Sequence, residues 1–239
     1  MDIAKLLDDS LLKEQGERKT GKRSGKFSPS SFGRCFRYQI WNRADVKVSD
    51  PIGINVLRIF KVGHMFHKFL QDIVEGEKEV LIEEDDIKGF ADIVAEDEVV
   101  DLKTVRTRGF WAMKKQGYDM NAKNEDKILQ VVYYAKQLGK VKARLVFVCK
   151  DDLAMLDHLV FVADWKEKLE QELKSLRLYW NNYTRTQQLP LAEPRAFGGY
   201  ECKYCGFFTR CNAVEKPFIK NGTMCSHCKG LKVDCKCEV

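Results

Sequence analysis

The spacing of hydrophobic and polar residues changes along the chain, and each change predicts an element of secondary structure. Over residues 54–74, apolar side chains recur every three or four positions, as in an amphipathic helix of several turns. Residues 77–85, 87–97 and 98–106 are instead rich in β-branched residues and closely spaced, as in strands. This part of the sequence therefore predicts one helix followed by three strands.

A second group of helices and strands follows. A polar, basic stretch at residues 107–124 precedes a helix predicted at 127–139, two strands at 142–150 and 157–164, and a long amphipathic helix at 164–183. The apolar stripe of that last helix consists of Trp165, Leu169, Leu173, Leu176 and Trp180. Helices and strands in this order predict an α/β fold with a central mixed β-sheet flanked by helices.

The two ends of the chain differ from this central region. Residues 1–27 begin with a short amphipathic stretch and pass into a polar, basic segment, which predicts a mobile arm. Residues 189–200 are rich in Pro and Gly and predict a linker. We therefore expect a basic arm at 1–27, a main domain at 28–212 and a Cys-rich tail at 213–239.

Composition and charge narrow the class of protein. The chain has 239 residues with 41 Lys+Arg, 35 Asp+Glu and a net charge of +6, a mild excess that is compatible with a nucleic-acid partner without requiring one. No apolar run reaches the roughly 18 residues that a membrane span requires. The acidic residues near the start are unlike a signal peptide. We therefore expect a cytoplasmic protein with no membrane partner.

The cysteines are the most unevenly distributed residues. An odd total of nine without a secretion signal argues for metal ligands rather than disulfides. Cys202, Cys205 and Cys211 form C-x2-C-x5-C, which leaves a four-coordinate site one ligand short. Cys35 could supply that ligand from far upstream and would then connect the two ends of the domain. This spacing alone does not choose between zinc and an iron–sulfur cluster.

The last four cysteines form a separate set. Cys225, Cys228, Cys235 and Cys237 have the spacing C-x2-C-x6-C-x-C and could close a tetrahedral thiolate site alone, so we predict a small zinc knuckle. The alternative is a flexible tail that binds no metal. Cys149 lies in an apolar run and is expected to be a buried core thiol.

Two acids and a lysine on neighbouring strands indicate a catalytic centre. Because side chains alternate along a strand, Asp101 and Lys103 share a face, and Asp92, which follows Gly89 in G-x-x-D, can meet Asp101 from the preceding strand. Paired carboxylates are costly unless a cation neutralises them. Mg²⁺ prefers carboxylates, carbonyls and water, and the Leu102 carbonyl lies between the two side chains. The alternative for D-x-K is an exposed ion pair.

Two helix motifs accompany this cluster. Gly63 and His67 form G-x-x-x-H on the first predicted helix, and Gln130 and Tyr134 form Q-x-x-x-Y on the second. Residues four apart lie on one face of a helix, so each pair can point at a common site. Ordinary packing in the core is the alternative for each.

Taken in this order, the motifs resemble those of the RecB-like nucleases of the PD-(D/E)XK superfamily. The cysteine set resembles that of their iron–sulfur branch, which includes CRISPR-associated RecB-type exonucleases and AddB-like nuclease domains. The resemblance covers residues 28–212 and implies a restriction-endonuclease-like nuclease core. It implies that Mg²⁺ or Mn²⁺ is bound by His67, Asp92, Asp101 and the Leu102 carbonyl.

The resemblance also implies roles for the other motif residues. Lys103 matches the catalytic lysine, and Gln130 and Tyr134 match the helix motif that lines the site near the bound strand. A structural 4Fe–4S cluster is implied at Cys35, Cys202, Cys205 and Cys211. The tail cysteines have no counterpart, and the absence of a helicase segment suggests a free-standing nuclease of a bacterium, an archaeon or a virus.

We therefore expect a metal-dependent DNA exonuclease that acts on single-stranded ends in recombination, repair or genome processing. The alternatives are a structure-specific flap or junction endonuclease, a nucleic-acid-binding module that does not cut, and a zinc-stapled interaction protein. Residues 105–118 combine basic and aromatic side chains, as strand-binding segments do. The same segment is compatible with a solvated loop whose Phe110 and Trp111 enter the core.

Overall fold

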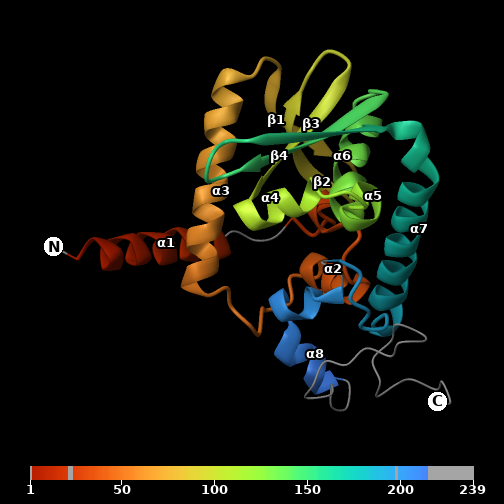
Figure 1. The fold of residues 1–239 in the computed structure, drawn as a ribbon. Helices are drawn as coiled ribbons and strands as arrows, with labels where there is room; N and C mark the ends of the chain where they lie inside the picture. The colour runs from red at the N-terminus through yellow and green to blue at the C-terminus, as the bar shows by residue number, and fades with distance from the viewer. Residues whose placement is uncertain (1, 21–23, 197–198, 215–239) are drawn as a thin grey trace.

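The computed structural model describes residues 2–20, 24–196 and 199–214 (Figure 1). Its centre is a five-stranded sheet in the order β1-β2-β3-β4-β5. The strands are β1 Glu77–Glu83, β2 Lys88–Val94, β3 Glu98–Val105, β4 Lys142–Cys149 and β5 Met155–Phe161. Only β3 and β4 pair in parallel, and the other neighbours are antiparallel. The mixed sheet expected from the sequence is therefore confirmed.

Helices lie before, between and after these strands. They are α1 Ile3–Thr20, η1 Pro29–Ser31, α2 Phe36–Arg43, α3 Ile54–Ile73, α4 Thr107–Met113, α5 Met120–Lys123, α6 Glu125–Gln137, α7 Val162–Thr186, η3 Glu201–Tyr204 and α8 Phe208–Val214. Two parallel strands cannot be joined by a tight turn, and here the crossover from β3 to β4 contains α4, α5 and α6. The order helix, three strands, helix, two strands, helix is that predicted from the sequence.

The two faces of the sheet are covered by different helices. On one face, Leu70 of α3 packs with Ile93, Leu102 and Val148. On the other face, α6 and α7 form the larger core with residues of β2, β3 and β4. Eight consecutive α6 residues, 128–135, are buried, because this helix lies between the sheet and α7. Residues of the middle strands can therefore be reached by side chains of α3 on one side and of α6 on the other.

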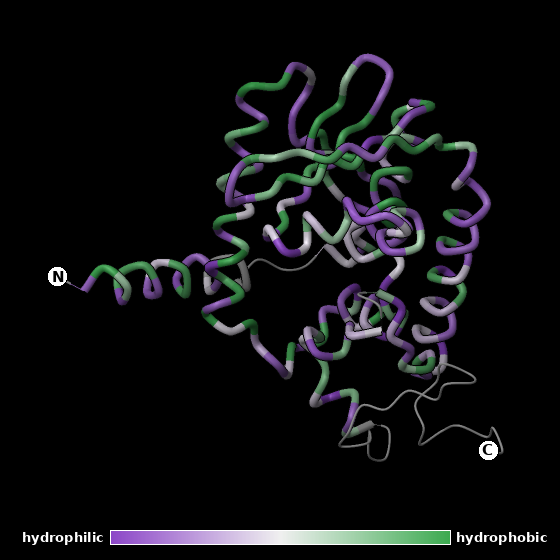
Figure 2. The backbone as a smooth tube through the Cα atoms, viewed as in Figure 1, coloured by the Kyte–Doolittle hydropathy of each residue, from purple (hydrophilic) through white to green (hydrophobic). Residues whose placement is uncertain are grey.

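The long helix α7 shows why an amphipathic pattern predicts packing. In Figure 2 its tube alternates between hydrophilic and hydrophobic stretches. Trp165, Leu169, Leu173 and Leu176 are buried, and Trp180 packs against the same core. The predicted apolar stripe is therefore the face that α7 turns toward the domain.

Residues 107–124, expected as a polar connection, contain two short helices. The ring of Phe110 is fully buried and anchors α4, while the neighbouring Trp111 remains half exposed. In α5, the Asp119 carboxylate caps the helix by accepting from the Ala122 N–H. The polar composition had hidden these helices because each buries only a small part of its surface.

The N-terminal segment is helical for longer than the short amphipathic stretch that the sequence indicated. Helix α1 continues to Thr20 and contacts α3 through the Arg58–Asp8 and Lys61–Glu14 ion pairs. Phe27, placed at the end of the arm, is buried and forms a parallel bridge with Ile87 beside the sheet. The division of the chain at residues 27 and 212 stays a prediction.

Cys149 is fully buried in β4, as predicted. The zinc knuckle expected at Cys225, Cys228, Cys235 and Cys237 lies outside the described residues. None of the helices in the described part of the chain combines the length and apolar character needed to cross a lipid bilayer.

Candidate functional site

The candidate catalytic site lies where the ladder between β2 and β3 ends. The last paired residues are Ile93 and Val100, and the next position on each strand is Asp92 and Asp101. Here the Asp92 carboxylate Oδ2, rather than a backbone group, accepts the Leu102 N–H at 2.9 Å. The N–H and C=O groups of one strand residue point toward the same neighbouring strand. The Leu102 carbonyl therefore also faces the unpaired gap between β2 and β3. The structure thus brings together the acids and the carbonyl predicted from the sequence.

The backbone around Asp92 is irregular on its other side as well. Glu79, its counterpart on β1, has a φ of +48°, in the left-handed region that L-residues rarely adopt, and the ladder between β1 and β2 skips this pair. The Gln71 amide of α3 bridges the irregularity by donating to Glu79 Oε1 at 2.7 Å and to the Asp92 carbonyl at 3.1 Å. Unusual backbone conformations of this kind are concentrated at functional sites.

Asp101 and Lys103 face each other within β3, as the strand period requires. Lys103 Nζ lies 2.7 Å from Asp101 Oδ2, and the Asp101 side chain is 2% exposed. Even so, neither carboxylate oxygen of Asp101 accepts a well-oriented hydrogen bond from a described residue. A buried carboxylate with unsatisfied oxygens has capacity for a further cation.

Helices on both faces of the sheet contribute the remaining groups. His67 Nδ1 of α3 lies 3.6 Å from Asp92 Oδ2. From α6, Gln130 Oε1 accepts from Lys103 Nζ at 3.2 Å. The gap between β2 and β3 is therefore a point where groups from opposite faces of the sheet meet.

The charges of the site perturb one another strongly. Burial, together with the Asp101 charge, raises the pKa of Asp92 to about 7. Burial also lowers the pKa of His67. For Lys103 burial acts to lower the pKa, but the Asp101 and Asp92 charges outweigh it and hold the pKa above its ordinary value. Two carboxylates and one ammonium leave the site short of positive charge.

Gly89 has a steric role beside Tyr134. A Cβ at Gly89 would lie 2.5 Å from Tyr134 Oη and 2.9 Å from Pro29 Cδ, so only glycine allows this close approach. Burial raises the pKa of the Tyr134 hydroxyl, which therefore stays protonated. At Gly63 a Cβ would meet Thr104 Oγ1 at 3.4 Å, an ordinary contact, so sterics do not require glycine there.

The donors at this site fit a hard divalent ion, although they do not yet converge on one. Among the residues that the structure describes, no three His, Cys, Asp or Glu side chains are already arranged to hold a metal ion. At the aspartates, the ammonium of Lys103 lies against Asp101, next to the space that an ion would occupy. The unsatisfied Asp101 oxygens, the Leu102 carbonyl and the adjacent Asp92 are nevertheless the ligand types that Mg²⁺ and Mn²⁺ prefer.

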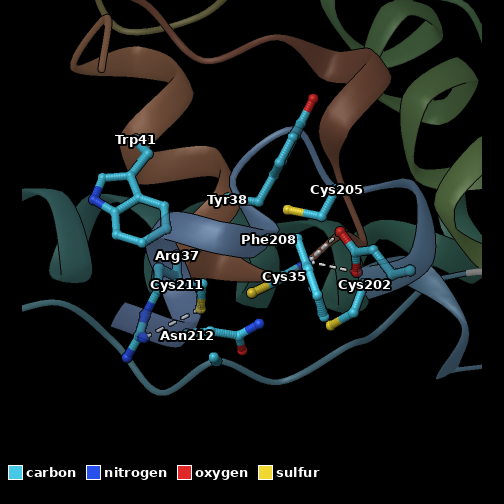
Figure 3. Close-up of a pocket in the computed structure, with 11 residues that line it drawn as sticks. Cys35, Arg37, Tyr38, Trp41, Cys202, Cys205, Phe208, Cys211 and Asn212 are labelled. Atoms are coloured by element: carbon cyan, nitrogen blue, oxygen red, sulfur yellow. Dashed lines mark hydrogen bonds between the residues drawn. The ribbon is translucent and has the colours of Figure 1, made fainter. Parts of the chain in front are cut away.

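The four cysteines assigned to one cluster line a common cavity (Figure 3). Cys35 precedes α2, Cys202 belongs to η3, Cys205 follows η3, and Cys211 belongs to α8. The cavity thus joins the start of the domain to its end. The shared role of the four cysteines as ligands of one centre stays a prediction.

Hydrogen-bond donors reach two of these sulfurs, whereas burial favours the protonated form of the other two. The buried Arg37 donates from Nη1 to Cys211 Sγ at 3.4 Å, and the Phe207 N–H donates to Cys205 Sγ at 3.4 Å. Burial raises the pKa of Cys35 to about 11 and that of Cys202 to about 12, so these two thiols are protonated at neutral pH unless a cation binds them. Four cysteine sulfurs in one cavity are the ligand type that a soft metal centre prefers, and a bound cation would offset the cost of forming the buried thiolates.

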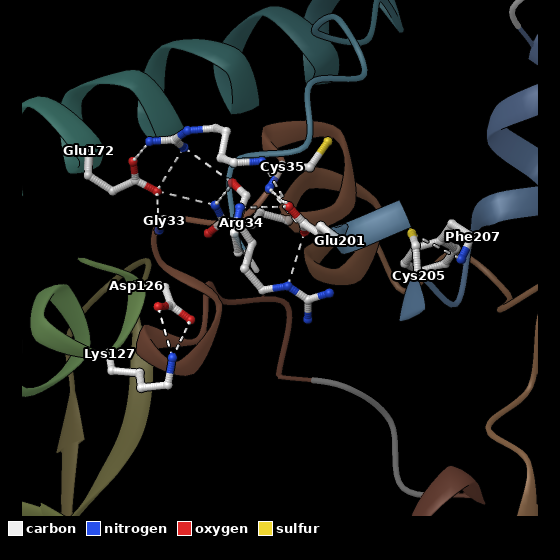
Figure 4. Close-up of polar contacts among 12 residues, drawn as sticks. Gly33, Arg34, Cys35, Asp126, Lys127, Glu172, Glu201, Cys205 and Phe207 are labelled. Carbon is white, nitrogen blue, oxygen red and sulfur yellow. Dashed lines mark hydrogen bonds and ion pairs between the residues drawn. The ribbon is translucent and has the colours of Figure 1, made fainter. Parts of the chain in front are cut away.

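A buried carboxylate places Cys35 beside the C-terminal segment (Figure 4). The Glu201 side chain is 1% exposed and its oxygens accept the Cys35 N–H at 2.9 Å, Arg34 Nε at 3.1 Å and the Arg195 N–H at 3.2 Å. Glu201 immediately precedes Cys202, so one residue fixes the relative position of two of the four cysteines.

A second buried carboxylate supports the same junction from α7. Glu172 accepts the Gly33 N–H at 3.0 Å, Gln39 Nε2 at 3.2 Å and Arg195 Nη2 at 2.6 Å. The segment before α2, the linker and α7 are thereby held by one group (Figure 4).

Four polar residues of these sites were not found from the sequence: Gln71, Glu79, Glu172 and Glu201. Gln71 lies one turn after His67, and Glu201 is an acid beside a cysteine motif, so each carried a local signal. Glu172 lies in a helix with many acids, and nothing local distinguishes it from them.

The fold and site define an α/β protein with a candidate metal-dependent centre on the central strands. No protein-family model and no curated protein sequence matches the chain. The solved structure of SSO0001 is similar to it, with a TM-score of 0.56 at 20% identity over 89% of this chain and 97% of that chain. This likeness shows a common fold over most of both chains.

Two structures of LHK-Exo, an alkaline exonuclease from Laribacter hongkongensis, are also similar. One has a TM-score of 0.45 at 13% identity over 69% of this chain and 94% of that chain. The other, in complex with dAMP, has a TM-score of 0.40 at 14% identity over 68% of this chain and 93% of that chain.

Proposed function

We propose that this protein is a metal-dependent nuclease that hydrolyses phosphodiester bonds of DNA. The observation that carries the proposal is the meeting of Asp92, Asp101, Lys103 and Gln130 at the interrupted ladder, where both Asp101 oxygens lack a well-oriented hydrogen bond. Two carboxylates with capacity for a divalent cation, beside a positioned lysine, suit the metal-assisted hydrolysis of an anionic substrate.

In this proposal, Mg²⁺ or Mn²⁺ would be held by His67, Asp92, Asp101 and the Leu102 carbonyl. When bound, such an ion neutralises phosphate charge and lowers the pKa of a coordinated water. Asp92 also accepts the Leu102 N–H, which fixes the carbonyl of the same residue in the gap. The chain thus supplies a carbonyl and two carboxylates from two adjacent strands.

Lys103 has two contacts that control where its ammonium lies. Asp101 holds it electrostatically and Gln130 accepts a hydrogen bond from it, so the ammonium stays beside the acids. From there it can donate to a phosphate oxygen and stabilise charge that develops in the transition state. Tyr134, kept protonated by burial, adds a neutral hydroxyl next to Gln130.

We further propose an exonuclease that acts on single-stranded ends in recombination, repair or genome processing. A linear labelled strand should be degraded with Mg²⁺ or Mn²⁺, whereas a covalently closed single-stranded circle should remain intact because it has no end. Cleavage of the circle at a similar rate would contradict exonuclease action and favour the structure-specific endonuclease. Failure to cut either substrate would favour a nucleic-acid-binding module.

For the cysteine cavity we propose a 4Fe–4S cluster with a structural role, bound by Cys35, Cys202, Cys205 and Cys211. The shared cavity, the N–H donors to sulfur and the buried Arg37 support a negatively charged thiolate centre. The proposed cluster would join the segment before α2 to the segment that contains η3 and α8. Zinc at the same four thiols is the alternative.

Replacing Cys35 with serine should abolish the cluster, because a three-thiol set lacks its fourth ligand. After anaerobic purification the natural chain should be brown and contain iron and sulfide, and Cys35→Ser should be colourless. The matched control is Cys149→Ala, whose thiol is buried in β4 away from the cavity and whose loss should leave the colour unchanged. A colourless natural chain with stoichiometric zinc would contradict the iron–sulfur proposal.

The zinc knuckle at Cys225, Cys228, Cys235 and Cys237 stays a prediction. Metal analysis of the same preparation tests it, since it requires one zinc per chain in addition to any iron.

A further inference from the structure

A basic pocket lies next to the end of the candidate catalytic strand. It has a volume of about 380 Å³ and is lined by Arg58, Ile59, Val62, Arg106, Thr107, Arg108, Lys150 and Asp151. Arg106 directly follows Val105, the last residue of β3, and is three residues beyond Lys103. At about 3.3 Å per residue, the pocket begins roughly 10 Å along the chain from the candidate catalytic lysine.

Two acids near this pocket, Asp8 and Asp151, already interact with other residues. Arg58 pairs with Asp8 of α1, with Nε 2.8 Å from Oδ1. Asp151 accepts both the hydroxyl and the N–H of Thr107, and so caps the start of α4. Asp8 and Asp151 together offset two of the four cations that line the pocket, so the pocket keeps an excess of positive charge.

Three cations of the pocket are not held by a direct ion pair, although Lys150 interacts electrostatically with the neighbouring Asp151. Within the described residues, the side chains of Arg106, Arg108 and Lys150 form no ion pair, and both arginines are exposed. Isolated cations grouped in one pocket repel each other, and a polyanion would relieve that repulsion.

An aromatic ring continues this surface along α4. Trp111 is 50% exposed and lies three residues after Arg108, on the same face of the helix. Its ring packs edge-on against the buried Phe110, at 5.7 Å between centroids, and Lys114 Nζ lies 5.1 Å from its centre. The ring is therefore held in place while one side remains available for stacking.

We propose that this surface, made of Arg106, Arg108, Lys150 and Trp111, binds the strand of single-stranded DNA that enters the candidate catalytic site. The three cations contact successive phosphates, and Trp111 stacks on a base. Cations for the backbone and an aromatic platform for unstacked bases are the two components of single-strand binding. This inference rests on the proposed nuclease function, because that function supplies the substrate.

The test measures binding of a fluorescent homothymidine strand to the full chain by anisotropy, in EDTA so that the strand stays intact. Because each phosphate contact on a single strand contributes about 0.7 to the salt slope, the variant R106Q/R108Q/K150Q should reduce that slope by about 2 and weaken binding at least about tenfold at low salt. Trp111→Ala should weaken binding roughly tenfold with the slope unchanged.

A control variant on α7 removes the same charge elsewhere. Lys166, Lys174 and Arg185 are exposed, and their replacement by glutamine should leave the salt slope as it is. An unchanged slope in R106Q/R108Q/K150Q, or an equal loss in the α7 variant, would overturn the inference. Unchanged affinity in Trp111→Ala would overturn its stacking part. Single Arg108→Gln provides the same measurement if the triple variant does not fold.

Cleavage assays on the same proteins separate this inference from the proposed function. If Asp101→Asn binds the strand but does not cut it, the nuclease function stands. The binding measurements on the pocket variants then decide whether the pocket binds the strand. If Asp101→Asn cuts as fast as the natural chain, the assignment of the catalytic site fails. If the natural chain cuts no strand with Mg²⁺ or Mn²⁺, the nuclease function fails even where the pocket variants lose binding.

Discussion

Replacing Asp101 with asparagine is expected to lower the rate of metal-dependent DNA cleavage by about 10³-fold or more, as when a principal charged group of a catalytic site is removed. The substitution keeps the shape of the side chain but removes the charge that holds the Lys103 ammonium 2.7 Å away. It also removes one of the two carboxylates proposed to bind the metal. Rates on an end-labelled single strand in Mg²⁺ and in Mn²⁺ measure the effect.

The same variant should keep its fold in the absence of metal. Asparagine removes the attraction between Asp101 and the Lys103 ammonium, but it also removes the repulsion between Asp101 and the buried Asp92, so the two changes in stability offset each other. The natural chain should gain thermal stability when Mg²⁺ or Mn²⁺ is added, because a ligand that binds only the folded state stabilises it. Asp101→Asn should lose most of that gain.

Asp157→Asn is the matched control. Asp157 is an exposed acid on β5, 3.5 Å from Arg144, and its replacement should change neither cleavage nor the response to metal. Full cleavage activity in Asp101→Asn would show that the site has been assigned to the wrong residues. A loss of folding in Asp101→Asn without metal would instead show that this carboxylate is structural.

The parts of the fold predicted from sequence are those governed by local periodicity. Strands β1 to β3 and helix α6 were predicted because their residue types and spacing are those of a strand or a helix over a few residues. The residues at their ends also mark where each element stops. Asp101 and Lys103 share a face for the same reason. Asp92 could be placed opposite Asp101 because adjacent antiparallel strands fix the register near their turn.

The parts that were missed depend on contacts between distant segments. The positive φ of Glu79 accompanies a hydrogen bond from the Gln71 amide of α3, and no spacing within β1 encodes that contact. Helix α4 forms around the buried ring of Phe110, with Met113 packed against the larger core, in a stretch whose other residues are largely polar and basic. Glu172 is one of several acids in α7, and only the folded chain brings Arg195 and Gly33 to it.

The junction around Glu172 carries the second prediction with a large expected effect, a loss of folding stability. Glu172→Ala is expected to destabilise the folded state by about 3–5 kcal/mol, the usual cost of removing one partner of a buried ion pair. The substitution takes the carboxylate, which is 1% exposed, away from the Arg195 guanidinium and the Gly33 N–H. Arg195 then keeps the Arg34 carbonyl as an acceptor, at 3.2 Å, but no counter-charge from Glu172. For a chain of this size the melting temperature should fall by about 10 °C. Thermal and urea unfolding followed by circular dichroism measure both quantities.

Glu170→Ala, two residues earlier on α7, is the matched control, because it removes the same charge from an exposed position. Glu170 also forms an ion pair, with Lys136 at 3.3 Å, but its side chain is 52% exposed. Solvent screens such a pair, so its removal should cost no more than about 1 kcal/mol. If the two variants were equally stable, Glu172 would contribute no more than a surface acid. A large difference between them would instead show that α7 holds the segment before α2 in place, and with it the position from which Cys35 reaches the cysteine cavity.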